Sequence, residues 1–102
     1  MLYSDMTPSH LENEMKQLQQ QGQRAYDEAN WSEYEINMHK WYLAKSYLIQ
    51  DNVHLKIGRT YSLAEAHDRL TVNKLKGIMA WGIRESDAEE IAVPIAMLEE
   101  YD

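Results

Sequence analysis

Hydrophobic residues near the start of the chain recur with the period of an α-helix. Between residues 11 and 29 a small or apolar residue occupies every third or fourth position of one stripe, and the residues off the stripe are polar. The stripe consists of Leu11, Met15, Leu18, Gly22, Ala25 and Ala29. Thr7 and Pro8 before it are a typical helix start, because a hydroxyl can cap the first amides and proline fits the first helical position. The pattern predicts an amphipathic helix with one buried face, on which Gly22 would let a neighbouring helix approach closely.

A second helix with two apolar faces is predicted to start at Asn30-Trp31-Ser32 and to run to about Ile49. Ser32 and Glu35 have the spacing of a capping box, and Trp31 and Ile36 have the spacing of a hydrophobic staple. One face carries Tyr34, Met38, Trp41 and Leu48, and the other carries Ile36, Leu43 and Tyr47. Because two apolar faces need two covers, we expect an antiparallel hairpin whose second helix also packs on the rest of the fold or on a second subunit. A homodimer would use the face of Ile36, Leu43 and Tyr47.

After residue 52 the hydrophobic period changes towards two, which indicates β-strands. A first strand carries Ile57, Tyr61 and Leu63 on one parity, and a second begins with Leu70 and Val72. Lys76-Gly77 provides a tight turn into a third strand, and Ser86-Asp87 provides the turn into a fourth strand, Glu89 to Val93. Pro94 is expected to end the fourth strand before a short helical turn.

The third strand, Ile78 to Arg84, is apolar on both faces. Ile78 and Ala80 share one face, and Met79, Trp81 and Ile83 share the other. A strand of this kind is expected to be covered on both sides. Four or five short antiparallel strands that close with a Pro-led helical turn indicate a small SH3-like β-barrel. We therefore predict an α+β fold in one domain of 102 residues, with a helical hairpin at 1–50 and the barrel at 53–102.

The formal net charge of −7 is unevenly distributed along the chain. Residues 53–84 contain six basic and two acidic residues, a local balance of +4, and both flanking segments are acidic. The six cations are Lys56, Arg59, Arg69, Lys74, Lys76 and Arg84. Net acidity weakens nonspecific attraction to phosphate backbones, although it permits a local basic patch.

These six cations and Trp81 form the candidate interaction surface, for which two functions are open. The first is a protein-binding or regulatory module, and the second is a nucleic-acid-associated regulator whose cations contact phosphates. One contiguous basic face would favour nucleic acid, and scattered cations would favour a protein partner. Trp81 suits an aromatic-lined binding surface, and the alternative for it is packing under the hairpin against Trp41 and Tyr34.

The sequence contains no recognisable catalytic machinery. Without Cys there is no thiolate nucleophile or thiolate metal site, and the four dispersed glycines form no phosphate loop. Glu35 and His39 lie four residues apart on the second helix, but a metal site needs at least one more ligand. We therefore expect a non-enzymatic protein with no catalytic, cofactor-binding or metal-binding residues.

Localisation follows from the missing membrane signals. The first residues lack a basic start followed by an apolar run, and no stretch approaches the ~18 apolar residues of a membrane span. The aromatic second helix has only Lys40 and Lys45 as cations, too few to bind anionic lipid. We expect a cytoplasmic protein that does not act at a membrane.

Four stretches of the chain resemble the YfhH-like family of small, largely uncharacterised proteins from Gram-positive bacteria. They are Tyr3-Ser4-Asp5-Met6, Ala44-Lys45-Ser46-Tyr47-Leu48, Lys76-Gly77-Ile78-Met79-Ala80-Trp81-Gly82-Ile83-Arg84 and Ala92-Val93-Pro94-Ile95-Ala96-Met97-Leu98. The resemblance implies a helical hairpin attached to an SH3-like barrel. Members are sometimes labelled transcriptional regulators, and the resemblance transfers no catalytic or binding residue.

Overall fold

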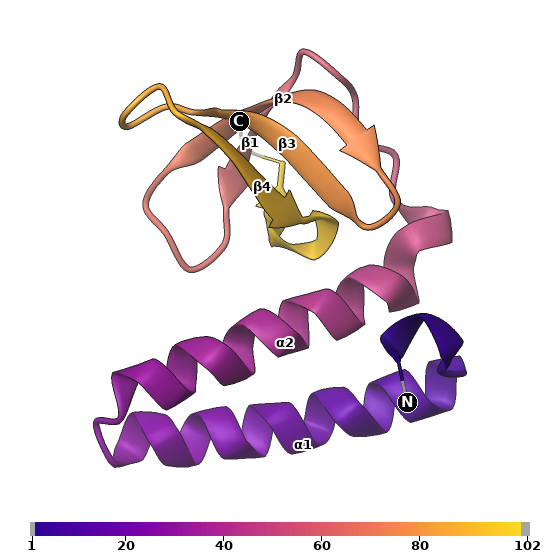
Figure 1. The fold of residues 1–102 in the computed structure, drawn as a ribbon, viewed down its shortest axis with the longest axis vertical. Coiled ribbons are helices and arrows are strands. Elements are labelled where there is room, and N and C mark those ends of the chain that lie inside the picture. Colours follow the sequence, from indigo (N-terminus) through magenta and orange to yellow (C-terminus); the bar gives the residue numbers. More distant parts are fainter. Residues whose placement is uncertain (1, 101–102) are drawn as a thin grey trace. The chain divides into compact units, whose positions relative to one another are not determined.

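In the computed structural model, which describes residues 2–100, a helical first half is followed by an antiparallel sheet (Figure 1). The chain divides into two compact units, residues 1–49 and residues 50–102. The first contains a short 3-10 helix η1 (Tyr3–Asp5), α1 (Pro8–Asp27) and α2 (Trp31–Ile49). The second contains η2 (Gln50–Asn52), β1 (Thr60–Leu63), β2 (Arg69–Lys76), β3 (Met79–Arg84), β4 (Glu90–Pro94), η3 (Ile95–Met97) and β5 (Leu98–Glu99). The predicted α+β class is confirmed.

Helix α1 begins where the sequence predicts. The Thr7 hydroxyl oxygen accepts a hydrogen bond of 3.3 Å from the His10 amide, and Pro8 occupies the first helical position. The buried residues of the stripe are Leu11, Leu18, Gly22 and Ala25. Gly22 faces α2, but a Cβ added there would lie 3.6 Å from the Met38 sulfur, an ordinary contact, so the packing does not require glycine.

The turn between the helices differs from the prediction. Ala29 does not extend the stripe; it has a positive φ of 56° and ends α1 in a Schellman motif. Its amide donates to the Tyr26 carbonyl at 3.1 Å and the Asn30 amide donates to the Ala25 carbonyl at 2.8 Å. Since Asn30 follows directly, its side chain caps α2 by accepting from the Glu33 amide at 3.3 Å.

The predicted capping box of Ser32 and Glu35 is therefore wrong by two residues, and so is the hydrophobic staple. Trp31 and Ile36 are 54% and 50% exposed. Trp31 instead packs edge-on against Tyr26, with ring centroids 5.2 Å apart. The residues of α2 that are most completely buried, Asn37, Tyr42, Ala44 and Ser46, lie outside both predicted apolar stripes.

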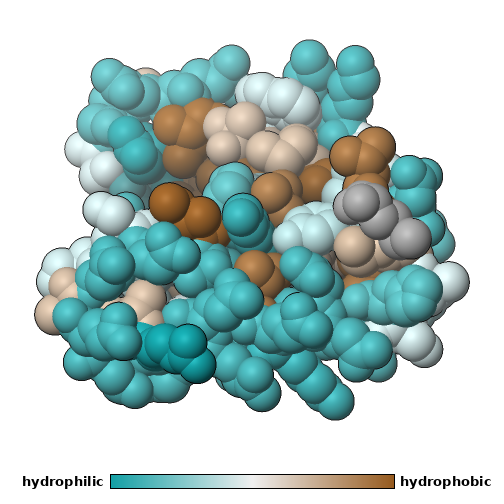
Figure 2. Space-filling model, turned by 60° about the horizontal axis from the view of Figure 1, so that its bottom comes forward, coloured by the Kyte–Doolittle hydropathy of each residue, from teal (hydrophilic) through white to brown (hydrophobic). Residues whose placement is uncertain are grey.

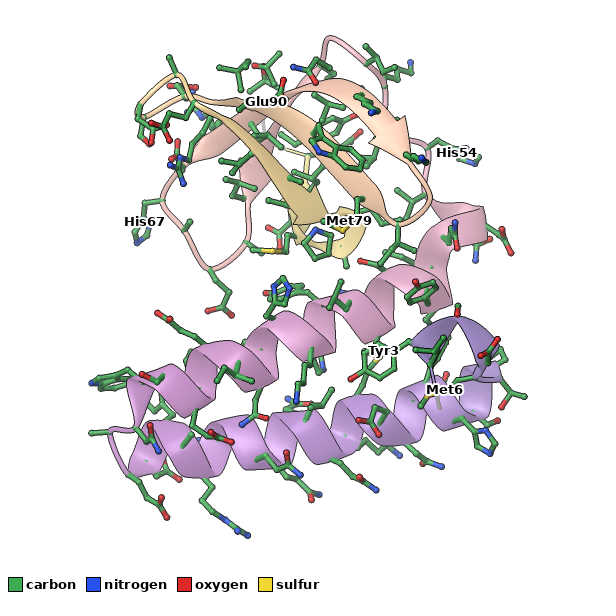
Figure 3. All side chains as sticks on the ribbon, viewed as in Figure 1. Tyr3, Met6, His54, His67, Met79 and Glu90 are labelled. Carbon is green, nitrogen blue, oxygen red and sulfur yellow. The ribbon has the colours of Figure 1, made fainter. Side chains whose placement is uncertain are left out.

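Element η1 contacts the second helix of the hairpin (Figure 3). The Tyr3 side chain is half-buried and interacts with the Glu14 carboxylate of α1. Burial and the neighbouring Glu14 charge raise the pKa of the Tyr3 hydroxyl, so this residue remains a neutral donor. Tyr3 thus links the segment before α1 to the hairpin.

The five strands form one antiparallel sheet in the order β4-β3-β2-β1-β5. Its buried core consists of Tyr61, Leu63, Leu70, Val72, Ala80, Val93 and Ile95. These residues include the predicted inward positions of the first three strands, except that Ile57 precedes β1 and is 66% exposed. Pro94 closes β4 and is followed by η3, as expected.

The sheet is open. Over residues 2–100, β4 and β5 are its two edges, and no ladder joins them. Pro94 lies on the β4 edge, and the neighbouring Ile95 amide donates to the Ile78 carbonyl at 2.8 Å. Because neighbouring residues of a strand point their amides in opposite directions, the Pro94 nitrogen points away from β3. No strand lies on that side to accept a hydrogen bond among residues 2–100, so proline is tolerated there.

The β2–β3 pairing leaves no room for a side chain at Gly82. A Cβ added there would lie 2.3 Å from the Thr71 carbonyl oxygen and 2.8 Å from the Leu70 side chain. No side chain fits in this space, which is why glycine interrupts an otherwise apolar strand. The two-residue turn at Gly77-Ile78 has a positive φ of 58° at Gly77, which also favours glycine.

The second face of β3 is only partly covered. Met79 and Trp81 are half-buried, and Ile83 is 39% exposed. The prediction that this strand is covered on both sides is therefore wrong at Ile83. We call this face of β1 to β4, which carries Thr71, Lys74, Trp81, Ile83 and Ala92, the outer sheet face.

Candidate functional site

Trp81 lies in the middle of the outer sheet face. It is paired with Lys74 of β2 on one side and Ala92 of β4 on the other. The Lys74 ammonium lies 5.0 Å from the centroid of the Trp81 ring, which is cation–π geometry. Ala92 is exposed and small, so the opposite flank of the indole is not covered by a large side chain of β4. Lys74 and Trp81 therefore form a cationic and aromatic surface on two neighbouring strands.

An irregularity in β2 brings Lys74 to this face. Strict alternation would place Lys74 with Leu70 and Val72, which point into the core. The register shifts between Val72 and Lys74, so Asn73 is an extra residue and Lys74 pairs with Trp81. The Asn73 amide donates to the Glu90 carboxylate at 3.2 Å. The Lys74–Trp81 pair thus depends on a bulge that the hydrophobic pattern does not reveal.

The three arginines of the candidate surface are ion-paired within the chain. Arg59 lies 3.5 Å from Glu100, and its guanidinium also lies 5.8 Å from the Tyr61 ring centroid. Arg69 lies 3.8 Å from Glu85. These pairs place Arg59 and Arg69 beside acidic residues of the same sheet, which reduces the positive potential that either presents to solvent.

Arg84 belongs to the opposite parity of β3 from Trp81. Its guanidinium binds the Asp87 carboxylate through two nitrogens and lies 3.9 Å from Glu89. The hydrogen bond to Asp87 raises the pKa of Arg84 and lowers that of Asp87. Arg84 is therefore a turn-stabilising residue at this end of the sheet.

The three lysines have a different environment. In the part of the chain that the structure describes, Lys56, Lys74 and Lys76 form no ion pair within 4.0 Å. Lys74 and Lys76 share the outer parity of β2, and Lys56 lines a hollow beside the β2–β3 turn. Arg69 and Arg84 thus lie at one end of β2 and Lys74 and Lys76 lie towards the other, and the two ends are about 23 Å apart at 3.3 Å per residue. Arg59 lies between them, because its carbonyl accepts from the Val72 amide midway along β2.

Asp68 stabilises the end of the sheet that carries Arg69 and Arg84, which we call the arginine end. Its carboxylate accepts hydrogen bonds from the Ser86 hydroxyl at 2.6 Å, the Arg69 amide at 2.8 Å and the Ser86 amide at 3.2 Å. These donors, the Ser86 hydroxyl first, lower the pKa of Asp68. Because Ser86 donates directly to Asp68, the pair links the β1–β2 turn to the β3–β4 turn.

Among residues 2–100 no group of three or more His, Asp or Glu side chains could hold a metal ion. Glu35 and His39 are both exposed and line one shallow depression on α2, without a third ligand. His54 and His67 lie on loops at opposite ends of the sheet (Figure 3). The groups that could do chemistry are therefore dispersed over the described surface.

The predicted dimer face is unevenly exposed. Ile36 is 50% exposed, whereas Leu43 and Tyr47 are half-buried. The face of the molecule shown in Figure 2 is mostly hydrophilic with several separate hydrophobic patches. A homodimer through this face remains a prediction.

Sequence reasoning missed a buried polar residue in the hairpin. Asn37 is 3% exposed, and its side-chain nitrogen has no hydrogen-bond partner among the described residues. It lies next to Gly22 and lines a hollow of about 150 Å³ between α1 and the start of α2. The sequence contains a signal for this burial. Asn37 directly precedes Met38, and Met38 belongs to the apolar stripe that lies near Gly22 of α1.

No helix in the described part of the chain is both long enough and apolar enough to span a membrane.

Residues 2–100 thus form a small α+β protein whose candidate site is an aromatic and cationic sheet surface. A family model described as a protein of unknown function, DUF1811, matches residues 1–99. The Uncharacterized protein YfhH of Bacillus subtilis (strain 168) is 33% identical over 101 residues, which are 98% of this chain and 96% of the relative. The chain belongs to this YfhH-like DUF1811 family, and the resemblance found in the sequence is confirmed.

Proposed function

We propose that the protein is a non-enzymatic, cytoplasmic protein-binding module that docks a partner on the outer sheet face. The observation that supports this is the Lys74–Trp81 pair, with 5.0 Å between the ammonium and the ring centroid. Tryptophan is enriched at the centre of protein interfaces because it buries a large area and still forms a polar contact. The apolar stem of a lysine can pack on a partner while its ammonium stays in a polar environment. The exposed Ile83 two residues along β3 extends the apolar part of this surface.

The arrangement of cations favours a protein over a nucleic acid. Contact with a phosphate backbone requires several unpaired cations along one path. Arg59, Arg69 and Arg84 are paired with carboxylates, and the remaining lysines are grouped near one end of β2. Lys74 beside the Trp81 indole, with Lys76 further along the same face of β2, suits a partner segment that combines an apolar side chain with acidic residues.

We extend the proposal to the curvature of the sheet, which we take to be SH3-like. Strand β1 pairs with both β2 and β5, and the 3-10 turn η3 leads from one sheet edge to the other. An experimental structure in which β5 separates from β1 would contradict this barrel-like arrangement.

Capture of a partner from the protein's own cell extract tests the proposed function. The tagged full chain, its Trp81→Ala variant and its Trp31→Ala variant are compared, each with and without nuclease treatment. Trp31 is a matched control, because it is a 54% exposed tryptophan of the helical unit. We expect a protein partner that resists nuclease, is lost with Trp81→Ala and is retained with Trp31→Ala. A partner retained by Trp81→Ala would contradict docking at the outer sheet face.

Binding of single-stranded nucleic acid is the second candidate function, favoured by the Lys74 ammonium beside the Trp81 ring. Bases can stack on an exposed indole while lysines contact the backbone. With Lys56, Lys74 and Lys76 as the only contacts, the slope of log affinity on log salt would be about −2 for a single strand. If fluorescence titration at low salt detects no binding of single-stranded RNA, this candidate function is excluded.

A further inference from the structure

A hollow of about 250 Å³ opens beside the β2–β3 turn, within the sheet unit. Its apolar walls are Val53, Leu55, Leu75 and Ile95. Ile95 is buried in the core, whereas Leu75 is 36% exposed at the mouth. At about 30 Å³ for each water-sized group, the hollow has room for roughly eight non-hydrogen atoms.

The hollow has no acidic lining residue among residues 2–100. Its polar side chains are those of Gln50, His54 and Lys56, and Lys56 is the charged one. The chain has a net charge of −7, so a hollow lined by a lysine and no carboxylate differs from the acidic balance of the whole sequence. Lys56 forms no ion pair within 4.0 Å in the part of the chain that the structure describes.

The backbone at Lys56 is held in place, although its side chain forms no ion pair with any residue from 2 to 100. The Lys56 amide donates to the Tyr61 hydroxyl at 2.9 Å, and Tyr61 is 1% exposed in the sheet core. The loop that supplies both Lys56 and His54 is therefore anchored to the core (Figure 3 labels His54). A fixed backbone lowers the entropy cost of presenting these two side chains to a ligand.

Gly77 keeps the mouth of the hollow open. It lines the hollow with a positive φ of 58°, and nothing lies within 4 Å of the position where a Cβ would be. The Gly77 turn is required by the two-residue hairpin, so an open mouth follows from the geometry of the turn itself.

We propose that this hollow binds a small organic carboxylate whose apolar body has about six carbons. The apolar chain would displace water from Leu55, Leu75 and Ile95, and the carboxylate would be balanced by Lys56 at the rim. A neutral molecule of the same shape would gain only the binding free energy of its apolar contacts, and acetate would gain only that of the charge interaction with Lys56. The site lies apart from the Lys74–Trp81 pair and does not depend on the proposed protein partner.

Titration of the isotopically labelled full chain with hexanoate, followed by amide NMR, tests the proposal. We expect saturable shifts at residues 53–56, 75–77 and 95, with weaker binding of 1-hexanol and no saturable binding of acetate. Lys56→Gln should weaken hexanoate binding about two- to fivefold, the range that an exposed ion pair provides, and should leave 1-hexanol unchanged. Leu75→Ala should weaken both hexanoate and 1-hexanol.

Lys16→Gln is the matched control, because Lys16 is an exposed lysine of α1 and its loss changes the net charge equally. The amide spectrum of each variant also reports whether the fold is intact. The proposal is overturned if hexanoate causes no saturable shift at these residues, if 1-hexanol binds as tightly as hexanoate, or if Lys16→Gln weakens binding as much as Lys56→Gln.

Discussion

At the scale of single residues, two glycines differ in whether a Cβ would fit at their position. A methyl group at Gly82 would lie 2.3 Å from the Thr71 backbone, whereas one at Gly22 would make only ordinary contacts. Gly82→Ala should therefore destabilise the protein by about 1–3 kcal/mol or more, the cost of overpacking. Gly22→Ala should stabilise it by about 0.5–1 kcal/mol, because alanine favours the helix. Thermal unfolding measures both, and equal melting temperatures for the two variants would contradict the tight contact at Gly82.

The carboxylates at the arginine end of the sheet predict how stability depends on pH. Hydrogen bonds to Ser86 and Arg84 hold the pKa values of Asp68 and Asp87 below their ordinary value of 3.8. The stabilisation is therefore complete above about pH 4 and is lost as the pH falls through the lower folded-state pKa. Asp68→Asn should flatten the decline in melting temperature below about pH 4. Glu12→Gln, which removes an exposed carboxylate of α1, should keep the wild-type slope.

The hydrophobic pattern predicted the buried residues of the sheet core better than it predicted the residue that caps α2. Leu70, Val72 and Ala80 are buried as alternation requires, because one face of a sheet must exclude water. The capping of α2 by Asn30 was not predicted, since Ser32 is also a good cap and the choice depends on the left-handed Ala29 before it. Local propensity alone could not distinguish the two caps.

At the scale of elements, the hairpin contains a polar residue that its stability does not require. The buried Asn37 side-chain nitrogen has no partner in the described part of the chain, and a buried unsatisfied donor costs about 1–3 kcal/mol. Asn37→Leu should therefore stabilise the hairpin by about 1 kcal/mol, whereas Asn37→Asp should destabilise it by burying a charge. Urea unfolding of both variants is the measurement. A loss of stability with Asn37→Leu would show that the amide is satisfied, for example by a buried water.

The candidate site illustrates why element patterns were only partly informative. The strands, their antiparallel order and the turn at Gly77 follow from hydrophobic period and turn chemistry. The bulge at Asn73 reverses the side on which Lys74 lies, and a single extra residue in a polar stretch leaves no mark on that period. Trp81 was identified from the sequence, but its cationic partner could be identified only from the register.

At the scale of the whole molecule, the sequence predicts that hairpin and sheet unfold as one domain. Contacts divide the chain into two units after Ile49, and within the first unit α1 packs against α2. Deleting residues 1–29 should expose Tyr34, Met38 and Trp41 and lower both melting temperature and solubility. A truncated chain as stable and soluble as the full one would contradict a single cooperative domain.

Docking of a protein on the outer sheet face is tested most directly by photo-crosslinking in the native cell. A photoreactive amino acid in place of Ala92 lies next to Trp81, on an exposed position of β4. The same group in place of Gln20, an exposed position of α1, is the control. We predict a discrete crosslinked protein from position 92 that disappears when Lys74→Ala and Trp81→Ala are combined, and none from position 20. A crosslink from position 20 alone, or one at position 92 that survives loss of Lys74 and Trp81, would contradict docking at this face.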